Sequence, residues 1–319
     1  MIRQLAWMST LLWLAACATA SAQSYPTRPI RLILPTAPGS SPDVLARPIA
    51  QRLGEALGQT VVVENVPGAA GAIAVERAMK APPDGHTLLY GFNSLVTMNP
   101  ALYRKLPYDV ERDMAPVGMV MAGSYVWAAN NDLAANSIPE LIALAKARPR
   151  QISYVSIGPG TAAHLGVELL AAQAGVEFLH VPSKSALLSE VIGGQVQMKI
   201  DPTSVIIPQV RAGKLKALAV TGPKRLPQLP DVPAVAESVP GYELLGWHAV
   251  WAPAGTAREI IARLNAELAA AVRAPESVAR LAAVAFEPAV STPDELAAQI
   301  RREAAVWARL IKARNITLD

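Results

Sequence analysis

The sequence predicts an α/β protein of two domains, each with a mixed sheet flanked by helices. Strand-like and helix-like stretches alternate from Ile30 onward, with helices of about 10 to 15 residues between strands, which is typical of a largely parallel sheet. The chain is longer than one hydrophobic core usually fills, so two domains are expected. Hydrophobic residues make up 52% of the chain and charged residues 17%, which indicates a globular protein.

Residues 1–22 have the layout of a secretory signal peptide. Arg3 gives a positive start, an apolar run covers residues 5–16, and small residues follow at Ala18, Ala20 and Ala22. The run is short for a membrane span, and no second apolar stretch follows it. We therefore expect export to the periplasm, with a membrane anchor at the start of the chain as the alternative.

Cys17 is the only cysteine, so the sequence predicts no disulfide framework. Leu14 to Cys17 also match a bacterial lipoprotein cleavage site, at which Cys17 would become the lipidated N-terminus. Cleavage after Ala22 is the competing interpretation, because Ala20-Ser21-Ala22 suits signal peptidase. Lipid anchoring through Cys17 and simple removal both remain open.

The remaining elements follow in chain order. Residues 30–34, 61–63 and 87–90 are expected to be strands, and 43–57 and 71–80 helices. In the middle of the chain, strands are predicted at 125–129, 152–155, 178–181, 196–200 and 215–220, with helices at 139–147, 163–174 and 187–192. Capping boxes predict helix starts at Ser137, Thr256 and Thr292.

No obvious linker divides the chain at its midpoint, so a chain that leaves the first domain and later returns to it fits better than two consecutive domains. We expect a discontinuous first domain of residues 23–124 plus 223–319 and a second domain of residues 125–222. Four prolines between residues 223 and 233 mark the irregular stretch at the return.

The turn after the first strand is the first candidate binding loop. Ligands of open α/β sheets lie beyond the carboxyl ends of strands, where helices begin. Gly39 lets main-chain amides approach an anion, Ser40 and Ser41 offer hydroxyls, and the helix start adds partial positive charge. The alternative is an ordinary loop in which Ser41 caps its helix. A single glycine does not make the dinucleotide fingerprint, so no cofactor is expected.

Two further loops follow the same logic. After the predicted strand 152–155, Gly158 and Gly160 expose main-chain amides and Thr161 opens the next helix. Beyond residues 178–181, Lys184 offers a counter-charge, although a solvated surface lysine is the commoner outcome.

Enzymatic, metal and nucleic-acid functions find little support. The four histidines never fall at metal-ligand spacing, and the chain has neither a Gly-x-Ser-x-Gly elbow nor a phosphate loop. An exported hydrolase using Ser156 or Ser41 is the remaining enzymatic alternative. Lysines and arginines are spread without a run, at a formal net charge of +4, which argues against a nucleic-acid partner.

Many segments, in the same order, resemble the Bug receptors, the solute-binding components of tripartite tricarboxylate transporters. They are residues Tyr25–Ile33, Ala37–Gly39, Leu45–Arg47, Gly58–Asn65, Pro82–Leu89, Asn99–Tyr103, Leu106–Asp109, His180–Pro182, Gly193–Val196, Leu229–Pro233 and Ala252–Thr256.

The resemblance implies a two-domain periplasmic binding protein of the Venus-flytrap type with two crossover strands, and no catalysis. Its ligand would be a small organic anion held in the interdomain cleft by main-chain amides and hydroxyls. The partners would be permease subunits of the transporter or, alternatively, a membrane sensor kinase, and the receptor itself a monomer. The expected ligand-binding residues are Thr36, Ala37, Pro38, Gly39, Ser40, Ser41, Asp43, Asn93, Ser94, Ser156, Gly158, Gly160, Thr161, His164, Ser183, Lys184 and Asp201.

Three places depart from the family pattern and all lie in these loops. Thr36 stands where an aromatic is common, and Ser40-Ser41-Pro42 replaces a glycine-rich run. Ser183-Lys184-Ser185 replaces the usual tyrosine, lysine and glycine. The identity of the ligand therefore does not carry over.

Overall fold

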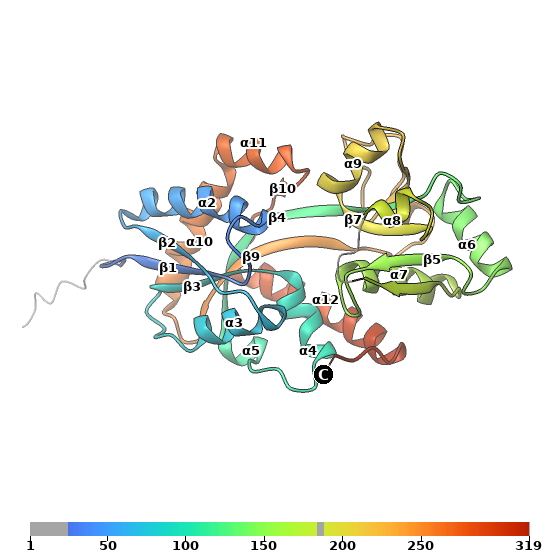
Figure 1. The fold of residues 1–319 in the computed structure, drawn as a ribbon. Coiled ribbons are helices and arrows are strands. Elements are labelled where there is room, and N and C mark those ends of the chain that lie inside the picture. The colour runs from blue at the N-terminus through green and yellow to red at the C-terminus, as the bar shows by residue number, and fades with distance from the viewer. Residues whose placement is uncertain (1–24, 184–187, 319) are drawn as a thin grey trace, which may run out of the picture.

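A computed structural model describes residues 25–183 and 188–318 of the chain. The expected signal peptide 1–22, Cys17 and Lys184 lie outside these residues. Figure 1 shows two lobes side by side, joined by two strands that run through the middle of the molecule. Within the described residues, no helix is both long and apolar enough to cross a membrane.

The first lobe is built from both ends of the chain (Figure 1). Its elements are β1 (Ile30–Leu34), α2 (Ser41–Leu57), β2 (Val61–Asn65), α3 (Ala72–Met79), β3 (Thr87–Phe92), α4 (Asn99–Leu102), α5 (Val110–Asp113), β4 (Met114–Ala129), β9 (Leu245–Pro253), α10 (Arg258–Arg273), α11 (Pro275–Ala283), β10 (Glu287–Pro288) and α12 (Pro293–Ala313). A π-helical turn at Ser94–Met98 precedes α4.

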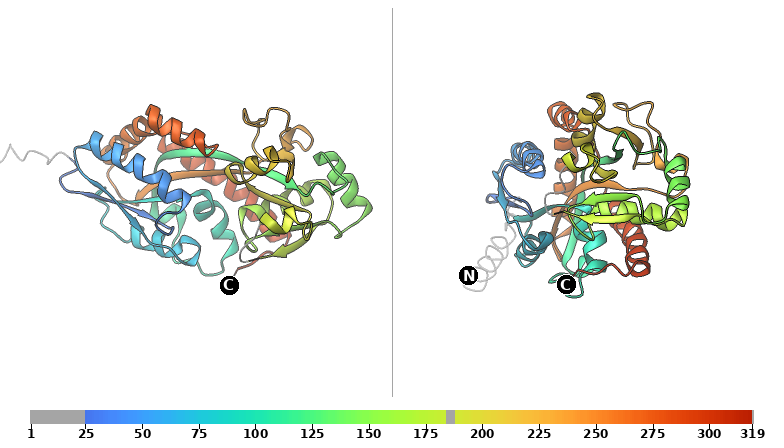
Figure 2. Two further views of the ribbon diagram at one scale, coloured as in Figure 1. Left: turned by 45° about the horizontal axis from the view of Figure 1, so that its top comes forward. Right: turned by 45° about the vertical axis from the view of Figure 1, so that its right-hand side comes forward.

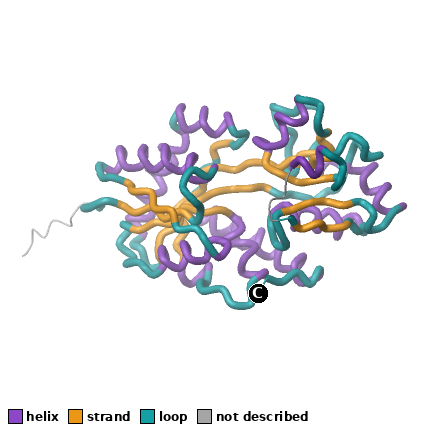
Figure 3. Tube along the Cα trace, in the orientation of Figure 1, coloured by secondary structure: helices purple, strands orange, loops and turns teal. Residues whose placement is uncertain are grey.

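The second lobe uses the middle of the chain and the end of β4. Its elements are α6 (Ile138–Ala147), β5 (Ser153–Ser156), α7 (Ala162–Ala174), β6 (Leu179–Pro182), α8 (Leu188–Ile192), β7 (Met198–Pro202), α9 (Thr203–Arg211) and β8 (Lys216–Val220). Figures 2 and 3 show that helices cover the strands of both lobes from outside.

The sheets mix parallel and antiparallel neighbours, as the sequence predicts. In the first lobe β1 lies between β2 and β3 in parallel, and β9 then pairs antiparallel with β3 and β4. In the second lobe β5 lies parallel to β6 and β7, while the end of β4 runs antiparallel to β7 and β8. The carboxyl ends of β5 and β7 therefore meet at one edge.

Strand β4 makes the crossing between the lobes, because its first part pairs with β9 and its last residues pair with β7 and β8. The chain returns where Leu244 donates its amide to Thr221 and β9 begins opposite Ser124. Tyr242 and Leu244 pack in the same cluster as Trp127 of the second lobe. These contacts favour a return at Leu245, later than the boundary at residue 223, and we infer that the stretch between belongs to the second lobe.

Apolar clusters lie on both faces of each sheet and fix the helices against it. In the first lobe α2 and α10 cover one face, and α3 and the start of α12 cover the other. The second half of α12 reaches the other lobe, where Trp307 joins the cluster around Trp127. Helix α12 therefore braces both lobes.

Two of the three capping predictions are confirmed. Thr292 and Glu295 form the expected box, and the Ser137 hydroxyl accepts the amide of Glu140. The third is wrong, because α10 begins one residue late and the Thr256 hydroxyl donates instead to the carbonyl of Pro253 at 2.7 Å.

Candidate ligand-binding site

A buried carboxylate organises the first candidate loop. Asp43 is 3% exposed and accepts the amide of Gly39 at 2.9 Å, two hydrogen bonds from Arg47 at 3.0 and 2.8 Å, and one from Asn65 at 2.9 Å. Asn65 also donates to the carbonyl of Thr36 at 3.0 Å. The bonds from Arg47, with those from Gly39 and Asn65, lower the pKa of Asp43 to about 2 despite its burial. The loop is thus held by the helix that follows it.

This bracing leaves the tip of the loop in solvent. Ala37, Pro38 and Gly39 are exposed, and Gly39 has φ of +76°, a conformation that favours glycine. Ser40, not Ser41, is the N-cap residue, and its hydroxyl donates to the carbonyl of Ala37 at 2.7 Å instead of capping. The alternative of a helix capped by Ser41 is therefore wrong.

Two hydroxyls of this loop contribute less than the sequence suggested. The Ser40 hydroxyl is used by the loop itself, and the Thr36 hydroxyl oxygen is buried with no partner among the described residues. Ser41 is the first residue of α2. At the tip the Gly39 amide is already bonded to Asp43 and Pro38 has none, so the loop offers an anion mainly the Ala37 amide and those of the first turn of α2.

The second loop brings most of its predicted residues together at the start of α7. Thr161 is the N-cap, since its hydroxyl accepts the amide of His164 at 3.4 Å and donates to the carbonyl of Gly158 at 2.9 Å. Ala162 and Ala163 form the first turn, where main-chain amides have no partner within the helix. Both residues are half-buried. The start of α7 is the better anion site of the two, because Pro42 removes one such amide from α2.

Three aromatic rings support this loop from below. The His180 ring contacts those of Tyr154 and His164 at centroid separations of 4.8 and 4.4 Å, and the centroids of Tyr154 and His164 lie 6.3 Å apart. The amide of Gly160 donates to Nδ1 of His164 at 3.1 Å, so the proton of the neutral ring is on Nε2. Burial lowers the pKa values of both His164 and His180 to about 4, which keeps the rings uncharged at neutral pH.

Ser156 lies under the loop and contacts its neighbours rather than the surface. It is 1% exposed, and its hydroxyl lies 2.8 Å from Nε2 of His180 and 3.0 Å from the carbonyl of Gly158. Its carbonyl accepts the amide of Ser183 at 3.0 Å. These bonds tie β5, β6 and the loop together, so Ser156 acts as a brace.

Asp201 lies on the neighbouring strand, where its half-buried carboxylate forms an ion pair with a buried lysine that the sequence did not indicate. Lys199, 7% exposed, lies 2.9 Å from the Asp201 carboxylate. Burial raises the pKa of Asp201 and outweighs the opposing effect of Lys199. The only sequence signal for this pair is their spacing of two along a predicted strand, which puts both side chains on one face.

Of the remaining predicted residues, Asn93 and Ser94 lie outside these clusters, and Ser183 contacts the second loop through its main chain. Asn93 is buried, and its side chain donates to the carbonyl of Leu245 at 2.8 Å, so it supports the crossing. Ser94 begins the π-helical turn that follows. The Ser183 hydroxyl donates to Glu190 at 3.3 Å.

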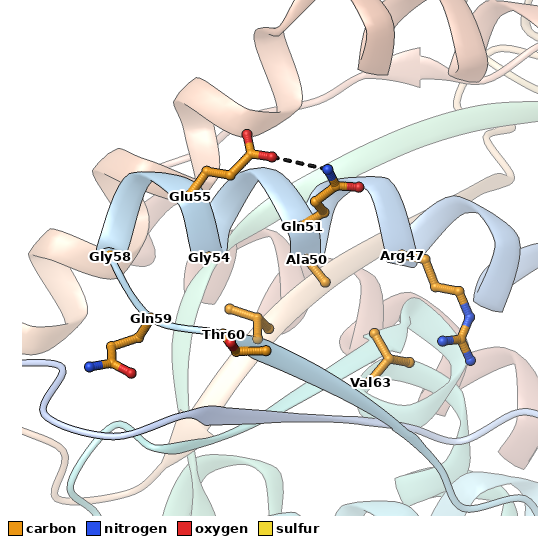
Figure 4. Close-up of a pocket in the computed structure, with 10 residues that line it drawn as sticks. Arg47, Ala50, Gln51, Gly54, Glu55, Gly58, Gln59, Thr60 and Val63 are labelled. Carbon is orange, nitrogen blue, oxygen red and sulfur yellow. Dashed lines mark hydrogen bonds between the residues drawn. The ribbon is translucent and has the colours of Figure 1, made fainter.

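A groove of about 630 Å³ runs between α2 and β2, outside both loops (Figure 4). Gln51 and Glu55 lie on its outward side, joined by a hydrogen bond of 3.0 Å, and Ala50 faces the strand. Among the residues that line the groove, Arg47 is also bonded to Asp43, the residue that holds the first loop. The groove therefore borders the candidate site without being part of it.

Comparison with known proteins gives the family. The model of the tripartite tricarboxylate transporter receptor family, TctC, matches residues 45–316. Protein BugT of Bordetella pertussis is 36% identical over 299 residues, covering 92% of each chain. A structure of R. palustris Rpa4515 with adipate is 34% identical, with a TM-score of 0.77, and covers 92% of this chain and 99% of its own.

A structure of MatC from Rhodopseudomonas palustris with bound malate is 28% identical, with a TM-score of 0.73, and covers 90% of this chain and all of its own. The family is one of transport receptors, so the contact between Ser156 and His180 does not indicate a hydrolase. The chain therefore belongs to the TctC family of tripartite tricarboxylate transporter receptors, which are non-enzymatic solute-binding proteins with the periplasmic binding protein fold.

Proposed function

We propose that this protein is an exported, periplasmic receptor that captures a small carboxylate between its two lobes and delivers it to the membrane subunits of a tripartite transporter. The observation that carries the proposal is the pair of loops at the starts of α2 and α7, one on each lobe, each braced by its own hydrogen bonds. Figure 1 shows both loops turned toward the middle of the molecule.

The chemistry of the loops suits a carboxylate. Main-chain amides at a helix start, together with the helix dipole, favour an anion. Each hydrogen bond to a charged group contributes about 1.5–3 kcal/mol net, so a few of them from both lobes give useful affinity. Each lobe offers only part of such a set, which links binding to closure of the lobes.

The relatives support the same ligand class. Rpa4515 was solved with adipate and MatC with malate, both dicarboxylates. Lys199 and Asp201 lie on β7, which runs parallel to β5, the strand that leads into the second loop. We expect this pair to influence which carboxylates fit.

The test is a thermal-shift and calorimetric screen of the purified protein with adipate, malate and related acids, against an alkylamine and a neutral diol of similar size. A ligand at 100 times its Kd stabilises the folded state by about 2.7 kcal/mol. That corresponds to a rise in Tm of roughly 5 °C for a chain of this size. No shift with any carboxylate would contradict the proposal.

A proline variant tests the role of the α7 start. Ala163→Pro removes one amide donor at the second position of the helix, where Pro42 of α2 and Pro139 of α6 are already tolerated. We expect about ten-fold weaker carboxylate binding with little change in Tm. Glu259→Pro, at the second position of α10 and outside both loops, is the matched control and should bind as the unaltered protein does.

A further inference from the structure

A second cavity, of about 440 Å³, lies where the chain crosses between the lobes. Its walls come from β4, from the residues leading into β9, from α12, and from Leu169 of α7. None of its lining residues belongs to the two candidate loops. It is therefore a separate site from the one proposed for the carboxylate.

One side of this cavity is apolar. Ala122 of β4 and Leu245 of β9 meet Leu169, Val306 and Trp307 there. Val306 is 37% exposed, although it is a large aliphatic residue on a helix that otherwise buries its apolar stripe. An apolar surface of this kind suits the hydrocarbon body of a ligand.

The other side carries more negative than positive charge. Glu243 and Glu303 line it together with a single cation, Arg302. The Glu303 carboxylate accepts the indole N–H of Trp247 at 2.8 and 3.0 Å and the Gln299 amide at 3.0 Å. Burial raises the pKa of Glu303, the charge of Glu243 raises it further, and Arg302 opposes both.

These bonds fix Glu303 but leave its charge only partly compensated. The donors Trp247 and Gln299 are neutral, and the two carboxylates repel one another. One Glu303 oxygen already accepts from both Trp247 and Gln299, whereas the other accepts only from Trp247, so an ammonium group can bond to the second oxygen without displacing the existing donors. A cation here removes the repulsion and gains a charge-assisted hydrogen bond to the half-buried Glu303.

We propose that this crossing cavity is a second binding site, which takes a small organic cation with an apolar body. The ammonium group binds between Glu303 and Glu243, and the hydrocarbon part lies on Leu169, Val306 and Trp307.

Calorimetry of the purified protein with 4-phenylbutylammonium tests this proposal. The neutral 4-phenylbutanol shares its apolar body and serves as the comparison ligand. We expect saturable binding of one cation per chain, with clearly weaker binding of the alcohol. Glu303→Gln keeps an oxygen for Trp247 but removes the charge. It should lower the affinity for the cation by about ten-fold or more. Glu177→Gln, an exposed carboxylate on another surface, should leave it unchanged.

A second variant covers the case in which Glu303→Gln does not fold. Val306→Trp fills the cavity from its exposed rim, leaves both carboxylates in the chain, and should abolish cation binding. Equal binding of the alcohol and the cation, or full cation binding by Val306→Trp, would overturn the proposal. The measurement uses no cleft ligand, so its outcome is independent of whether carboxylates bind between the lobes.

Discussion

Replacing Asp43 by asparagine tests how much the hydrogen bonds of its carboxylate stabilise the first loop. One carboxylate oxygen accepts from Arg47 and Asn65, and the other accepts from Gly39 and Arg47. Either orientation of the asparagine amide therefore turns an NH₂ group toward two donors. Because the substitution keeps the shape of the side chain, any effect comes from charge and hydrogen bonding.

The cost follows from these contacts. The Arg47 side chain is 50% exposed, so its ion pair contributes only about 0–1 kcal/mol. Losing the charged bond to either Gly39 or Asn65 costs about 1.5–3 kcal/mol. We expect the free energy of unfolding of Asp43→Asn to fall by about 2–3 kcal/mol in total. Without these bonds the loop is less ordered in the free protein, and ordering it on binding costs about 1–2 kcal/mol of binding free energy per residue. Carboxylate affinity should therefore fall at least about ten-fold.

Asp113→Asn is the matched control. Asp113 also accepts from an arginine and from a main-chain amide, and its pKa is likewise lowered to about 2 by Arg112, but it lies on α5 outside the loops. Urea unfolding gives the stability of both variants, and calorimetry with adipate or malate gives the affinity. We expect both variants to lose stability and only Asp43→Asn to lose affinity. Equal affinity in the two variants would refute the bracing role.

Three other perturbations have clear expected outcomes. Gly160→Ala forces a Cβ to within 2.8 Å of Leu102 and 2.9 Å of Leu318 at φ of +76°, so urea unfolding should show a loss of about 2–4 kcal/mol, whereas Gly175→Ala, at φ of +64° with no atom within 4 Å, should lose less. Burial lowers the pKa values of His164, His180 and His248 to about 4, below the unfolded value near 6.5, so the unfolded chain binds more protons between these values. Stability should therefore fall as pH drops from about 6.5 to 4. If the buried histidines cause this loss, the free energy of unfolding of His180→Gln should fall less steeply over the same pH range. An unchanged slope in this variant would contradict that cause. Thr36→Val removes a buried hydroxyl without a described partner, so Tm should stay level or rise, and a fall would show that the hydroxyl is satisfied.

The alternation of strands and helices was predictable from local patterns, whereas two crossing strands were expected only from the family resemblance, and their bounds were not predicted. The predicted strand 125–129 is only the end of β4. Its first half was not predicted, because Pro116 and Gly118 suggest a break in a strand there. In the structure the register shifts at these residues, so the strand continues through bulges. Strand β9 was missed because both of its faces are buried, which removes the alternating pattern by which a strand is recognised.

The candidate residues show which features of a site a sequence can reveal. Gly39, Gly158 and Thr161 could be named as candidates because helix starts and glycine turns have local signals, but the sequence did not show that the amides of both glycines bond to side chains beside them. Lys199 was missed because a lysine in a strand is usually solvated, and only the packing of the second lobe buries it. The aromatic stack beneath the second loop joins β5, β6 and α7, so no local pattern could predict it.

The hydroxyls of the loops are less available to a ligand than the sequence suggests. Those of Ser40 and Thr161 bond to the main chain of their own loops, and that of Ser156 bonds below its loop. Short polar side chains in tight turns commonly do this, because the nearest partner is their own backbone. In the proposed binding mode, recognition rests on main-chain amides, which distinguish an anion from a neutral molecule but not one carboxylate from another. We therefore expect selectivity among carboxylates to come from side chains such as Lys199 and Asp201, whose surroundings depend on the whole lobe.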